Sequence, residues 1–347
     1  MVSVVMSVRD GERHLGEAIE SILSQTFHDF EFIVINDGSK DETGSILVGY
    51  ENLDSRMRVY HQENHGLIYC LKKGCDLARG KYIARMDADD VSMPQRFSEQ
   101  VQYLEANRDI GILGTWVEYI DETGASLGEW SPPSKPGVIE WLLLFGNCLA
   151  HPSVMMRRDV VGKVGPYRHE ALYVEDYDLW ARSVGVTRLA NIPLPLVKRR
   201  ICEEGVSVQH YREQEKNTVK IMHAMMTQLV EKEISEGVIA KLRLCRKTCD
   251  GISIKEADML AALLRRLHRF FLSKHKLSDP EAKQVAGDVG KRLMRLAERV
   301  IEGSLYKGLI VYSQAFELNP SLITFSIAKK LLRAMLGRHF VSPCSQS

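Results

Sequence analysis

The sequence lacks the cysteine patterns that build zinc sites and disulfide frameworks. It contains seven cysteines, an odd number, and no two of them are spaced as Cys-x-x-Cys. Cys245 and Cys249 stand four residues apart in a stretch with helical character, without a neighbouring histidine or further cysteine. This usage argues against both kinds of site and favours a reducing compartment.

Long apolar runs are lacking as well. No segment of the sequence approaches the roughly 20 apolar residues that a membrane-spanning helix needs. Met1 leads directly into a short apolar stretch, without the basic residues that begin a secretory signal. We therefore expect a cytoplasmic protein, or one that is held on a membrane from its cytoplasmic side.

The formal net charge of +1 hides an asymmetry between the two parts of the chain. Residues 1–210 carry 22 Lys and Arg against 31 Asp and Glu, a net charge of −9, whereas residues 211–347 carry 24 against 14, a net charge of +10. The acidic part is compatible with a cation-dependent site. The basic part suggests an anionic partner such as a membrane surface, a polyphosphate or nucleic acid, unless the two parts neutralise each other across an interface.

The first hundred residues alternate between apolar runs and amphipathic stretches. Runs that suit buried strands occupy residues 2–8, 30–35, 57–60 and 82–86. Helices are expected over residues 15–23, from about residue 41, over 67–78 and over 94–106, on the basis of apolar periodicity and helix-starting residues. Alternating strands and helices with short connections predict an α/β protein with a doubly wound, mostly parallel sheet.

From about Tyr211 the composition shifts to helix-forming and basic residues. We expect an all-helical basic domain over residues 211–341, following a catalytic domain over 1–210, with residues 342–347 as a disordered tail. A basic amphipathic segment stands near the end, at 329–338. Two apolar stripes at helical spacing are expected to belong to a core more often than to a membrane contact: Ile221, Met222, Met225, Met226, Leu229 and Val230, and Leu260, Leu263, Leu264 and Leu267.

Three carboxylates follow the fourth expected strand within four residues: Asp87, Asp89 and Asp90. Because carboxylates resist burial without a partner, this strand end is expected to meet either solvent or a cation. Mg²⁺ and Mn²⁺ prefer hard oxygen ligands and often share them with the phosphates of a substrate. An acidic turn that caps the next helix is the alternative. The sequence has neither a Gly-x-Gly-x-x-Gly loop nor a P-loop to hold phosphates, so we favour a metal–diphosphate site.

Two other loops are expected at the same edge of the sheet, where open α/β sheets bind nucleotides. One follows the first strand, at residues 8–11, and the other follows the second, at residues 36–39. Asp37 in the second loop could accept a hydrogen bond from a base N–H.

A second acidic cluster, Glu175, Asp176 and Asp178, lies at the start of an expected helix. Helix N-termini favour carboxylates, so these residues could simply cap the helix. They could also supply a general base, since neighbouring acids raise one another's pKa towards the working pH. Trp180 would lie on the same helix face as Asp176 and could either stack on a sugar ring or belong to the core.

Over roughly residues 1–210 the chain resembles the inverting family 2 glycosyltransferases, which have the GT-A fold. The resemblance rests on motifs that occur in the family's order: residues 2–8, Ser24-Gln25-Thr26-Phe27, Ile35-Asn36-Asp37-Gly38-Ser39, residues 78–90, His151-Pro152-Ser153-Val154-Met155 and residues 175–180. It implies a nucleotide-diphospho-sugar donor and inversion at the anomeric carbon.

The resemblance also implies roles for individual residues. Asp37 would read the base, Asp87 would lie near the ribose and phosphate, and Asp89 would bind a divalent cation, Mn²⁺ or Mg²⁺. Asp176 would deprotonate the acceptor hydroxyl, and Glu175 is the alternative base. Further contacts to the donor are expected from Ser7, Val8, Arg9 and Arg85. Contacts to the acceptor or sugar are expected from Trp180 and His151.

Two departures from the family pattern bear on the donor and the metal. Many members have Val-Tyr-Asn where this chain has Val8-Arg9-Asp10, so this position leaves the choice among uridine, thymidine and guanosine open. We expect UDP as the nucleotide, with dTDP as the alternative. Many have Arg-x-His where this chain has Arg200-Ile201-Cys202. Because a thiol is a poorer ligand than imidazole for hard cations, either Asp89 and the diphosphate hold the metal, or the metal requirement is weak.

These observations together predict an enzyme that transfers one sugar to a glycan or lipid-linked acceptor in cell-surface polysaccharide synthesis. Its expected partners are the donor, that acceptor and an anionic membrane surface, and not nucleic acid. A Gln-x-x-Arg-Trp motif, typical of processive synthases, is absent. A sugar nucleotidyltransferase is the alternative, but residues 8–11 are too short for its glycine-rich loop. An inactive, transferase-like scaffold is a third hypothesis. The acidic residues of both clusters and Asp37 are all present, which argues against it.

Overall fold

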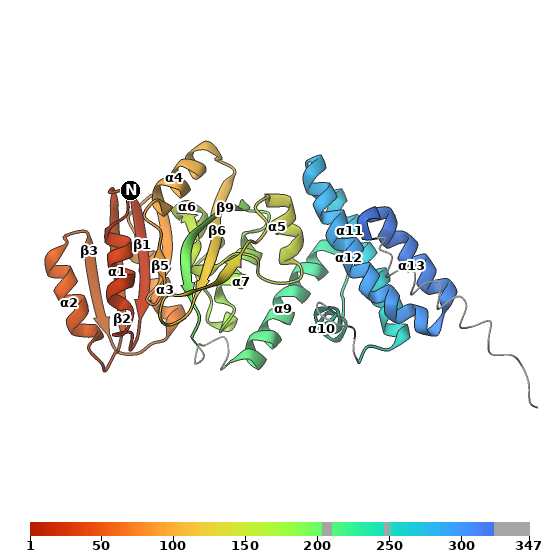
Figure 1. Cartoon of the computed structure of the whole chain (residues 1–347), viewed down its shortest axis with the longest axis horizontal. Coiled ribbons are helices and arrows are strands. Elements are labelled where there is room, and N and C mark those ends of the chain that lie inside the picture. Colours follow the sequence, from red (N-terminus) through yellow and green to blue (C-terminus); the bar gives the residue numbers. More distant parts are fainter. Residues whose placement is uncertain (203–209, 246–248, 250, 323–347) are drawn as a thin grey trace, which may run out of the picture. The chain divides into compact units, whose positions relative to one another are not determined.

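The computed structural model describes residues 1–202, 210–245, 249 and 251–322, and it divides into two compact units (Figure 1). The first comprises Met1–Ile221 and the second Met222–Ser347. The division falls inside helix α9, Tyr211–Val230. The expected tail at 342–347 and the basic segment at 329–338 lie outside the described residues.

Unit 1 is built on one mixed sheet of nine strands, in the order β3-β2-β1-β4-β8-β6-β9-β5, with β7 paired to β6. Its strands are β1 (Val2–Val8), β2 (Phe30–Asp37), β3 (Met57–Gln62), β4 (Tyr82–Asp87), β5 (Val91–Ser92), β6 (Ile110–Ile120), β7 (Ser126–Trp130), β8 (Met155–Arg157) and β9 (Arg188–Arg200). Strands β1 to β4 are parallel to one another, whereas β8 is antiparallel to both β4 and β6.

Helices pack on both faces of this sheet, as the alternation of elements predicts. The helices of unit 1 that precede α9 are α1 (Leu15–Leu23), α2 (Thr43–Leu53), α3 (Leu67–Leu77), α4 (Arg96–Ala106), α5 (Pro136–Leu143), α6 (Arg158–Val164) and α7 (Glu175–Ser183). Apolar side chains of α1, α2 and α4 share one buried cluster with Val4 and Met6 of β1. Helix α3 packs on the opposite face, where a Cβ at Gly74 would meet Val5 at 2.2 Å.

The strand register brings the polar strand ends together at one edge. Ser7 of β1 pairs with Asp87 of β4, and Val8 pairs with Asn36 of β2. The carboxyl ends of these three parallel strands therefore lie side by side. Ligands bind at such an edge in open α/β sheets.

Helix α9 begins within unit 1, where it contacts the segment that leads into α7. Nδ2 of Asn217 donates to the carbonyl of Leu172 over 3.0 Å, and Nε2 of Gln214 donates to the carbonyl of Tyr173 over 3.1 Å. The rings of Tyr173 and His210 stack with centroids 4.1 Å apart. Tyr173 has a φ of 67°, which is uncommon for a residue with a bulky side chain. These contacts from α9 help to hold that conformation.

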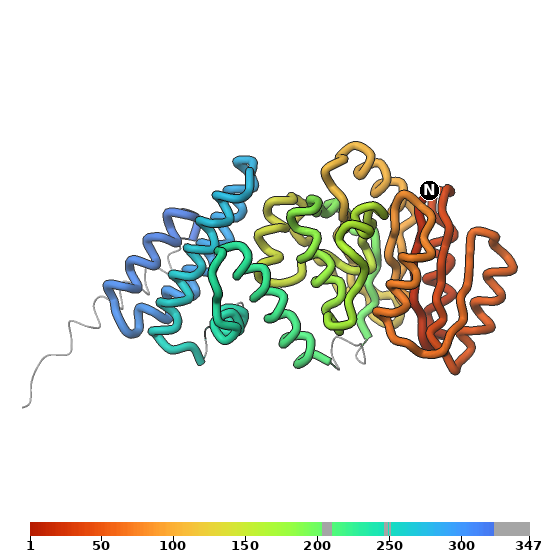
Figure 2. The backbone as a smooth tube through the Cα atoms, turned by 180° about the vertical axis from the view of Figure 1, so that it is seen from behind, coloured from red at the N-terminus to blue at the C-terminus, as the bar shows by residue number. Residues whose placement is uncertain are grey.

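Unit 2 is helical throughout its described residues. It contains the end of α9 and then α10 (Glu236–Leu244), α11 (Ile254–Lys274), α12 (Asp279–Gly303) and α13 (Leu305–Leu318). Figure 2 shows α11, α12 and α13 as adjacent tubes at the blue end of the chain. Asp258 of α11 forms an ion pair with Lys307 of α13 over 2.8 Å. No helix among the described residues is both long and apolar enough to span a bilayer.

The ends of the longest helices and their apolar stripes follow from the sequence. Ser253 and Ser278 each form a capping box, with Glu256 and Glu281 respectively, which satisfies N–H groups at the first turn. The two apolar stripes face the core, since the following members are fully buried: Met222, Met226, Leu260, Leu264 and Leu267.

Candidate active site

Three carboxylates gather at the carboxyl end of β4. One oxygen each of Asp87, Asp89 and Asp90 lies within 4.8 Å of the others. Asp87 and Asp89 are partly exposed, whereas Asp90 is buried. Carboxylates at this separation repel one another, and a divalent cation that accepts hard oxygen ligands would offset the repulsion.

Asp90 supplies the buried oxygen of this cluster that lacks a hydrogen-bond partner. Its Oδ1 accepts a hydrogen bond from the backbone N–H of Arg200 over 2.8 Å, but its buried Oδ2 has no hydrogen-bond partner. Burial and then the charges of Asp87 and Asp89 raise the pKa of Asp90 well above its usual value. Burial and Asp87 also raise the pKa of Asp89 to about 6. All potential metal ligands in this cluster are carboxylate oxygens, which suit Mg²⁺ or Mn²⁺.

Arg200, the last residue of β9, fixes the backbone beside this cluster. Its Nε donates to the carbonyl of Asp89 over 2.9 Å, and its Nη1 donates to the carbonyl of Asp121 over 2.8 Å. Its Nη2 donates to Glu17 over 2.6 Å. The thiol of Cys202 lies close by, since burial and then the charge of Asp89 raise its pKa. A neutral thiol is a weak ligand for a hard cation.

Asp37 at the end of β2 is buried and organises the loop between β3 and α3. Its Oδ1 accepts hydrogen bonds from Nε2 of Gln62 and the N–H of His65, both over 2.9 Å, and its Oδ2 accepts from the N–H of Gly66 over 2.8 Å. Burial by itself would raise the pKa of Asp37, but these hydrogen bonds outweigh it and lower the pKa. The carboxylate is therefore ionised and retains acceptor capacity for a ligand.

The other residues expected at the donor also lie at this edge of β1. Ser7 is partly exposed and Val8 is buried. Arg9 is exposed and forms an ion pair with Asp10 over 3.5 Å. Asp10 accepts a hydrogen bond from the N–H of Lys40 over 2.8 Å, which ties the loop after β1 to the loop after β2.

Arg85 of β4 is buried, and its charge reaches both acidic clusters. It forms an ion pair with Asp87 at the exposed end of its own strand. The same charge opposes the burial that raises the pKa values of Asp89, Glu175 and Asp176. Arg85 thus connects the clusters near residues 87–90 and 175–176 electrostatically.

The second acidic cluster opens helix α7, and its three members have different surroundings. Glu175 is buried, and burial together with the Asp176 charge raises its pKa to about 7. Asp176 is partly exposed and accepts hydrogen bonds from the N–H of Tyr177 over 2.6 Å and from Nδ2 of Asn147 over 2.7 Å. Asp178 forms an ion pair with Arg182 over 2.8 Å. This pair occupies Asp178 and leaves Glu175 and Asp176 as the acids suited to proton transfer.

Two residues expected to touch a sugar lie in the core. Trp180 is fully buried, and His151 is buried with its Nε2 at 2.9 Å from the hydroxyl of Tyr167. Burial and then the Arg85 and Arg199 charges lower the pKa of His151 well below its usual value, so the ring is neutral. Trp180 is thus one of the buried residues of α7, which is the core alternative left open by the sequence, and a sugar contact from Trp180 or His151 stays a prediction.

Comparison with known proteins agrees with this geometry. The family model described as glycosyl transferase family 2 matches residues 3–165. An uncharacterized glycosyltransferase of Methanocaldococcus jannaschii is 37% identical over 188 residues, which cover 53% of this chain and 64% of that protein. The O-antigen biosynthesis glycosyltransferase WbnJ of Escherichia coli is 38% identical over 183 residues, which cover 52% of this chain and 71% of WbnJ. The chain belongs to glycosyl transferase family 2.

A solved structure shows which fold this glycosyltransferase has. Residues 1–349 of TarS from S. aureus, in complex with UDP-GlcNAc, superpose with a TM-score of 0.55 at 16% identity, covering 93% of each chain. The likeness confirms the predicted GT-A fold and the helical region that follows it.

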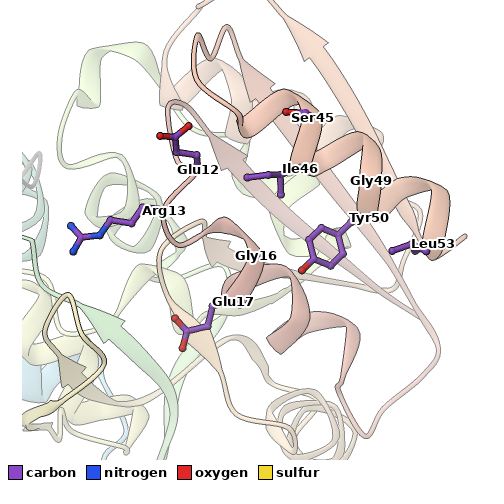
Figure 3. A pocket seen from close by; sticks show the side chains of 9 residues that line it. All are labelled: Glu12, Arg13, Gly16, Glu17, Ser45, Ile46, Gly49, Tyr50 and Leu53. Carbon is purple, nitrogen blue, oxygen red and sulfur yellow. The ribbon is translucent and has the colours of Figure 1, made fainter.

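A surface pocket of about 430 Å³ lies between α1 and α2 of the glycosyltransferase (Figure 3). Gly16 and Glu17 of α1 line it opposite Ile46 and Tyr50 of α2. The hydroxyl of Tyr50 donates to Glu20 over 2.7 Å. The acids at the ends of β4 and α7 do not line this pocket, although Glu17 connects its wall to Arg200.

Sequence reasoning missed two residues of the candidate site. Asn147, in the connection after α5, contacts Asp176 although 29 residues separate them. Arg200 was singled out only as part of a motif, and its contacts to Asp89 and Asp90 were not predicted. Neither contact leaves a periodic signal, because both join segments distant along the chain.

Proposed function

We propose that this enzyme is an inverting glycosyltransferase that moves one sugar from a nucleotide-diphospho-sugar to a hydroxyl of a glycan or lipid-linked acceptor. The observation that carries the proposal is the pair of acidic clusters connected by the buried charge of Arg85. One cluster suits a cation and a diphosphate, and the other suits a base. The role of WbnJ in O-antigen biosynthesis supports a role of this chain in cell-surface polysaccharide synthesis.

The donor would lie over the carboxyl ends of β1, β2 and β4. We assign recognition of the nucleobase to Asp37 and contact with the ribose and phosphate to Asp87. Further contacts to the donor are assigned to Ser7, Val8, Arg9 and Arg85. UDP is the favoured nucleotide, with dTDP as the alternative, and the complex of TarS with UDP-GlcNAc is consistent with this choice. Asp89 would hold Mn²⁺ or Mg²⁺, which neutralises negative charge on the departing diphosphate.

Asp176 is the proposed base. It takes the proton of the acceptor hydroxyl while the oxygen forms a bond to the anomeric carbon. The bond from that carbon to the diphosphate oxygen breaks at the same time, and its electron pair leaves with the diphosphate. Attack from the side opposite the leaving group inverts the anomeric configuration.

Turnover of a panel of nucleotide sugars, measured with Mn²⁺ and with chelator, tests the proposal. We expect a UDP-sugar to be consumed, and nuclear magnetic resonance of the product should show the inverted anomer. Retention of configuration would contradict the assignment of Asp176 as base. If no donor were turned over with or without Mn²⁺, the chain would instead be a transferase-like scaffold.

The basic second part of the chain supports a further proposal, weak association with an anionic membrane that carries the acceptor. Residues 211–347 have a net charge of +10, and each Lys or Arg near such a surface contributes about 1 kcal/mol, less as salt increases. Flotation with anionic and neutral liposomes should recover the full chain better with anionic ones, and better than a chain that ends near residue 320. Equal recovery in all cases would contradict it.

A further inference from the structure

Asn147 approaches the proposed base from outside helix α7. It lies in the connection between α5 and the 3₁₀ turn at His151–Ser153, and it is exposed. Its Nδ2 donates to Oδ2 of Asp176 over 2.7 Å, and its Oδ1 accepts from the N–H of Leu149 over 3.0 Å. The second bond fixes which end of the amide faces Asp176, because only the nitrogen end can donate to a carboxylate.

The two adjacent acids of α7 differ in the hydrogen bonds that they receive. Asp176 accepts one from Asn147 and another from the N–H of Tyr177 over 2.6 Å. Among the described residues, no side chain donates a hydrogen bond to the carboxylate of Glu175, and the hydrogen bond from its own backbone N–H only partly offsets the burial that raises its pKa. Donors directed at a carboxylate stabilise its ionised form, so the negative charge favours Asp176.

Glu175 and Asp176 also differ in their exposure to solvent. Glu175 is buried, whereas Asp176 is partly exposed beside the exposed Asn147. An acceptor hydroxyl that arrives from solvent can therefore reach Asp176 more readily. The charges of Arg199 of β9 and Arg85 of β4 oppose the burial that raises the pKa of Asp176. The charge of Asp176 in turn adds to the burial that raises the pKa values of Glu175 on the same helix and of Tyr167 from the segment before α7.

We propose that Asn147 is a positioning residue that makes Asp176, rather than Glu175, the carboxylate that takes the proton of the acceptor. The inference rests on the proposed function. The amide of Asn147 holds Oδ2 of Asp176 in place and keeps this carboxylate ionised. A free lone pair on a carboxylate oxygen of Asp176 receives the proton of the acceptor. The acceptor O–H bond breaks, a new O–H bond forms on Asp176, and the freed electron pair forms the glycosidic bond. The bond from the anomeric carbon to the diphosphate oxygen breaks, and its electron pair leaves with the diphosphate.

The pH dependence of kcat tests this role in the full-length enzyme. Burial raises the pKa of Asp176, and the hydrogen bond from Asn147 opposes that effect. In Asn147→Ala we expect the midpoint of the rising limb of the kcat–pH profile to move up by about one pH unit. At pH values below this limb, kcat should then be about tenfold lower than in wild type. Above the limb, kcat should return to within about threefold of wild type, and the donor KM should stay within about twofold.

Two further variants sharpen the test. Asn147→Asp keeps the oxygen that accepts the hydrogen bond from Leu149 but adds a negative charge beside Asp176. The rising limb of its kcat–pH profile should therefore lie at still higher pH. Adding Glu175→Gln to Asn147→Ala removes the neighbouring charge and should bring the limb back towards that of wild type. Asn107→Ala is the matched control, since Nδ2 of Asn107 donates to a backbone carbonyl at the end of α4 instead, over 2.9 Å.

The outcomes separate this inference from the function on which it rests. An unchanged limb in Asn147→Ala, or an equal loss of kcat at every pH, would overturn the inference while transfer activity itself stands. If the wild-type chain turned over no donor, the proposed function would fail, and this inference with it. A shift in Asn107→Ala equal to that in Asn147→Ala would also overturn it.

Discussion

Arg200 and Asp90 are joined by a hydrogen bond of 2.8 Å from the backbone N–H of Arg200 to Oδ1 of Asp90, although 110 residues separate them. The guanidinium of Arg200 also donates to the carbonyl of Asp89. The end of β9, which pairs with β5, thereby holds the acidic turn between β4 and β5 in place. The geometry of the candidate metal site consequently depends on a residue that is not itself a ligand.

Replacing Arg200 should therefore weaken the metal site as well as the fold. In Arg200→Met the carbonyls of Asp89 and Asp121 lose buried donors, and we expect a loss of about 2–4 kcal/mol in the free energy of unfolding. The Mn²⁺ concentration for half-maximal activity should rise. Urea unfolding and Mn²⁺ titration of activity measure the two effects. Arg157→Met is the matched control, because Arg157 donates to carbonyls at Leu104 and Ile110 instead, and it should lower stability without changing the Mn²⁺ titration.

The second prediction concerns the metal ligand itself. Asp89→Asn preserves the size of the side chain and removes its charge, so transfer should fall by orders of magnitude while the melting temperature stays similar or rises. Activity with and without chelator, together with thermal unfolding, measures this. Near-normal turnover of Asp89→Asn in chelator would show that the cation assignment is wrong.

The third prediction distinguishes the two acids of α7. Asp176→Asn should abolish transfer and leave donor affinity almost unchanged, because the acceptor proton matters only in the transition state. Glu175→Gln should retain much more activity. Single-turnover transfer and donor binding by calorimetry give both quantities. A larger loss of transfer in Glu175→Gln than in Asp176→Asn would move the base to Glu175, and a loss of donor affinity in Asp176→Asn would place Asp176 in the donor site.

The fourth prediction follows from the raised pKa values of Asp89, about 6, and of Glu175, about 7. The folded chain binds these protons more tightly than the unfolded chain, so their contribution to stability is present at low pH and is lost as pH rises from about 4 to 7. Each unit of raised pKa corresponds to about 1.4 kcal/mol, so the two raised pKa values set an upper bound of about 6 kcal/mol on the combined loss for the metal-free enzyme.

Variants and metal isolate this contribution from that of other acids. Asp89→Asn and Glu175→Gln should each make the fall in stability between pH 5 and pH 7 shallower. Mn²⁺ should stabilise the wild type at pH 7 more than at pH 5, because protons compete for the oxygens of Asp89. Urea unfolding at a series of pH values, with and without Mn²⁺, measures both. Parallel pH profiles for wild type and both variants would contradict the prediction.

The fifth prediction concerns Cys202, which occupies the position where many family members have histidine. Cys202→His places an imidazole near Asp89, where a thiol with a raised pKa now lies. Imidazole is the better ligand for Mn²⁺, so half-maximal activation should require less metal. Titration of activity with Mn²⁺ checks this, and Cys75→His, on helix α3, serves as the control. An unchanged Mn²⁺ requirement in Cys202→His would place residue 202 outside the metal's reach.

The part of the fold that sequence predicts well is the part built from local, repeated units. Strands β1, β2 and β4 follow largely apolar runs, and β3 follows the shorter stretch at 57–60. Strand β4 ends at Asp87, where the carboxylates begin. The pairing of β4 with β8 and of β6 with β9 could not be predicted in the same way. Those strands come from distant segments, and their partners depend on tertiary packing rather than on periodicity.

The same distinction applies to the candidate site. The acids were found from their positions at strand and helix ends, which is a local signal. Burial of Trp180 and the bond from Asn147 to Asp176 depend on which surfaces meet in the folded chain. Residue types at single positions carry little information about such contacts. The assigned roles of the acids remain predictions that the experiments above test.

The contacts between α9 and the segment before α7 have a practical consequence for dissecting the enzyme. A fragment that ends at residue 210, where the composition changes, would lose Gln214 and Asn217 and with them both hydrogen bonds to that segment. Tyr173 would then be free to relax from its φ of 67°, two residues before Glu175. A soluble catalytic fragment cut at residue 210 should therefore bind donor yet transfer sugar poorly, and the shortest fully active fragment should extend to Ile221 or beyond.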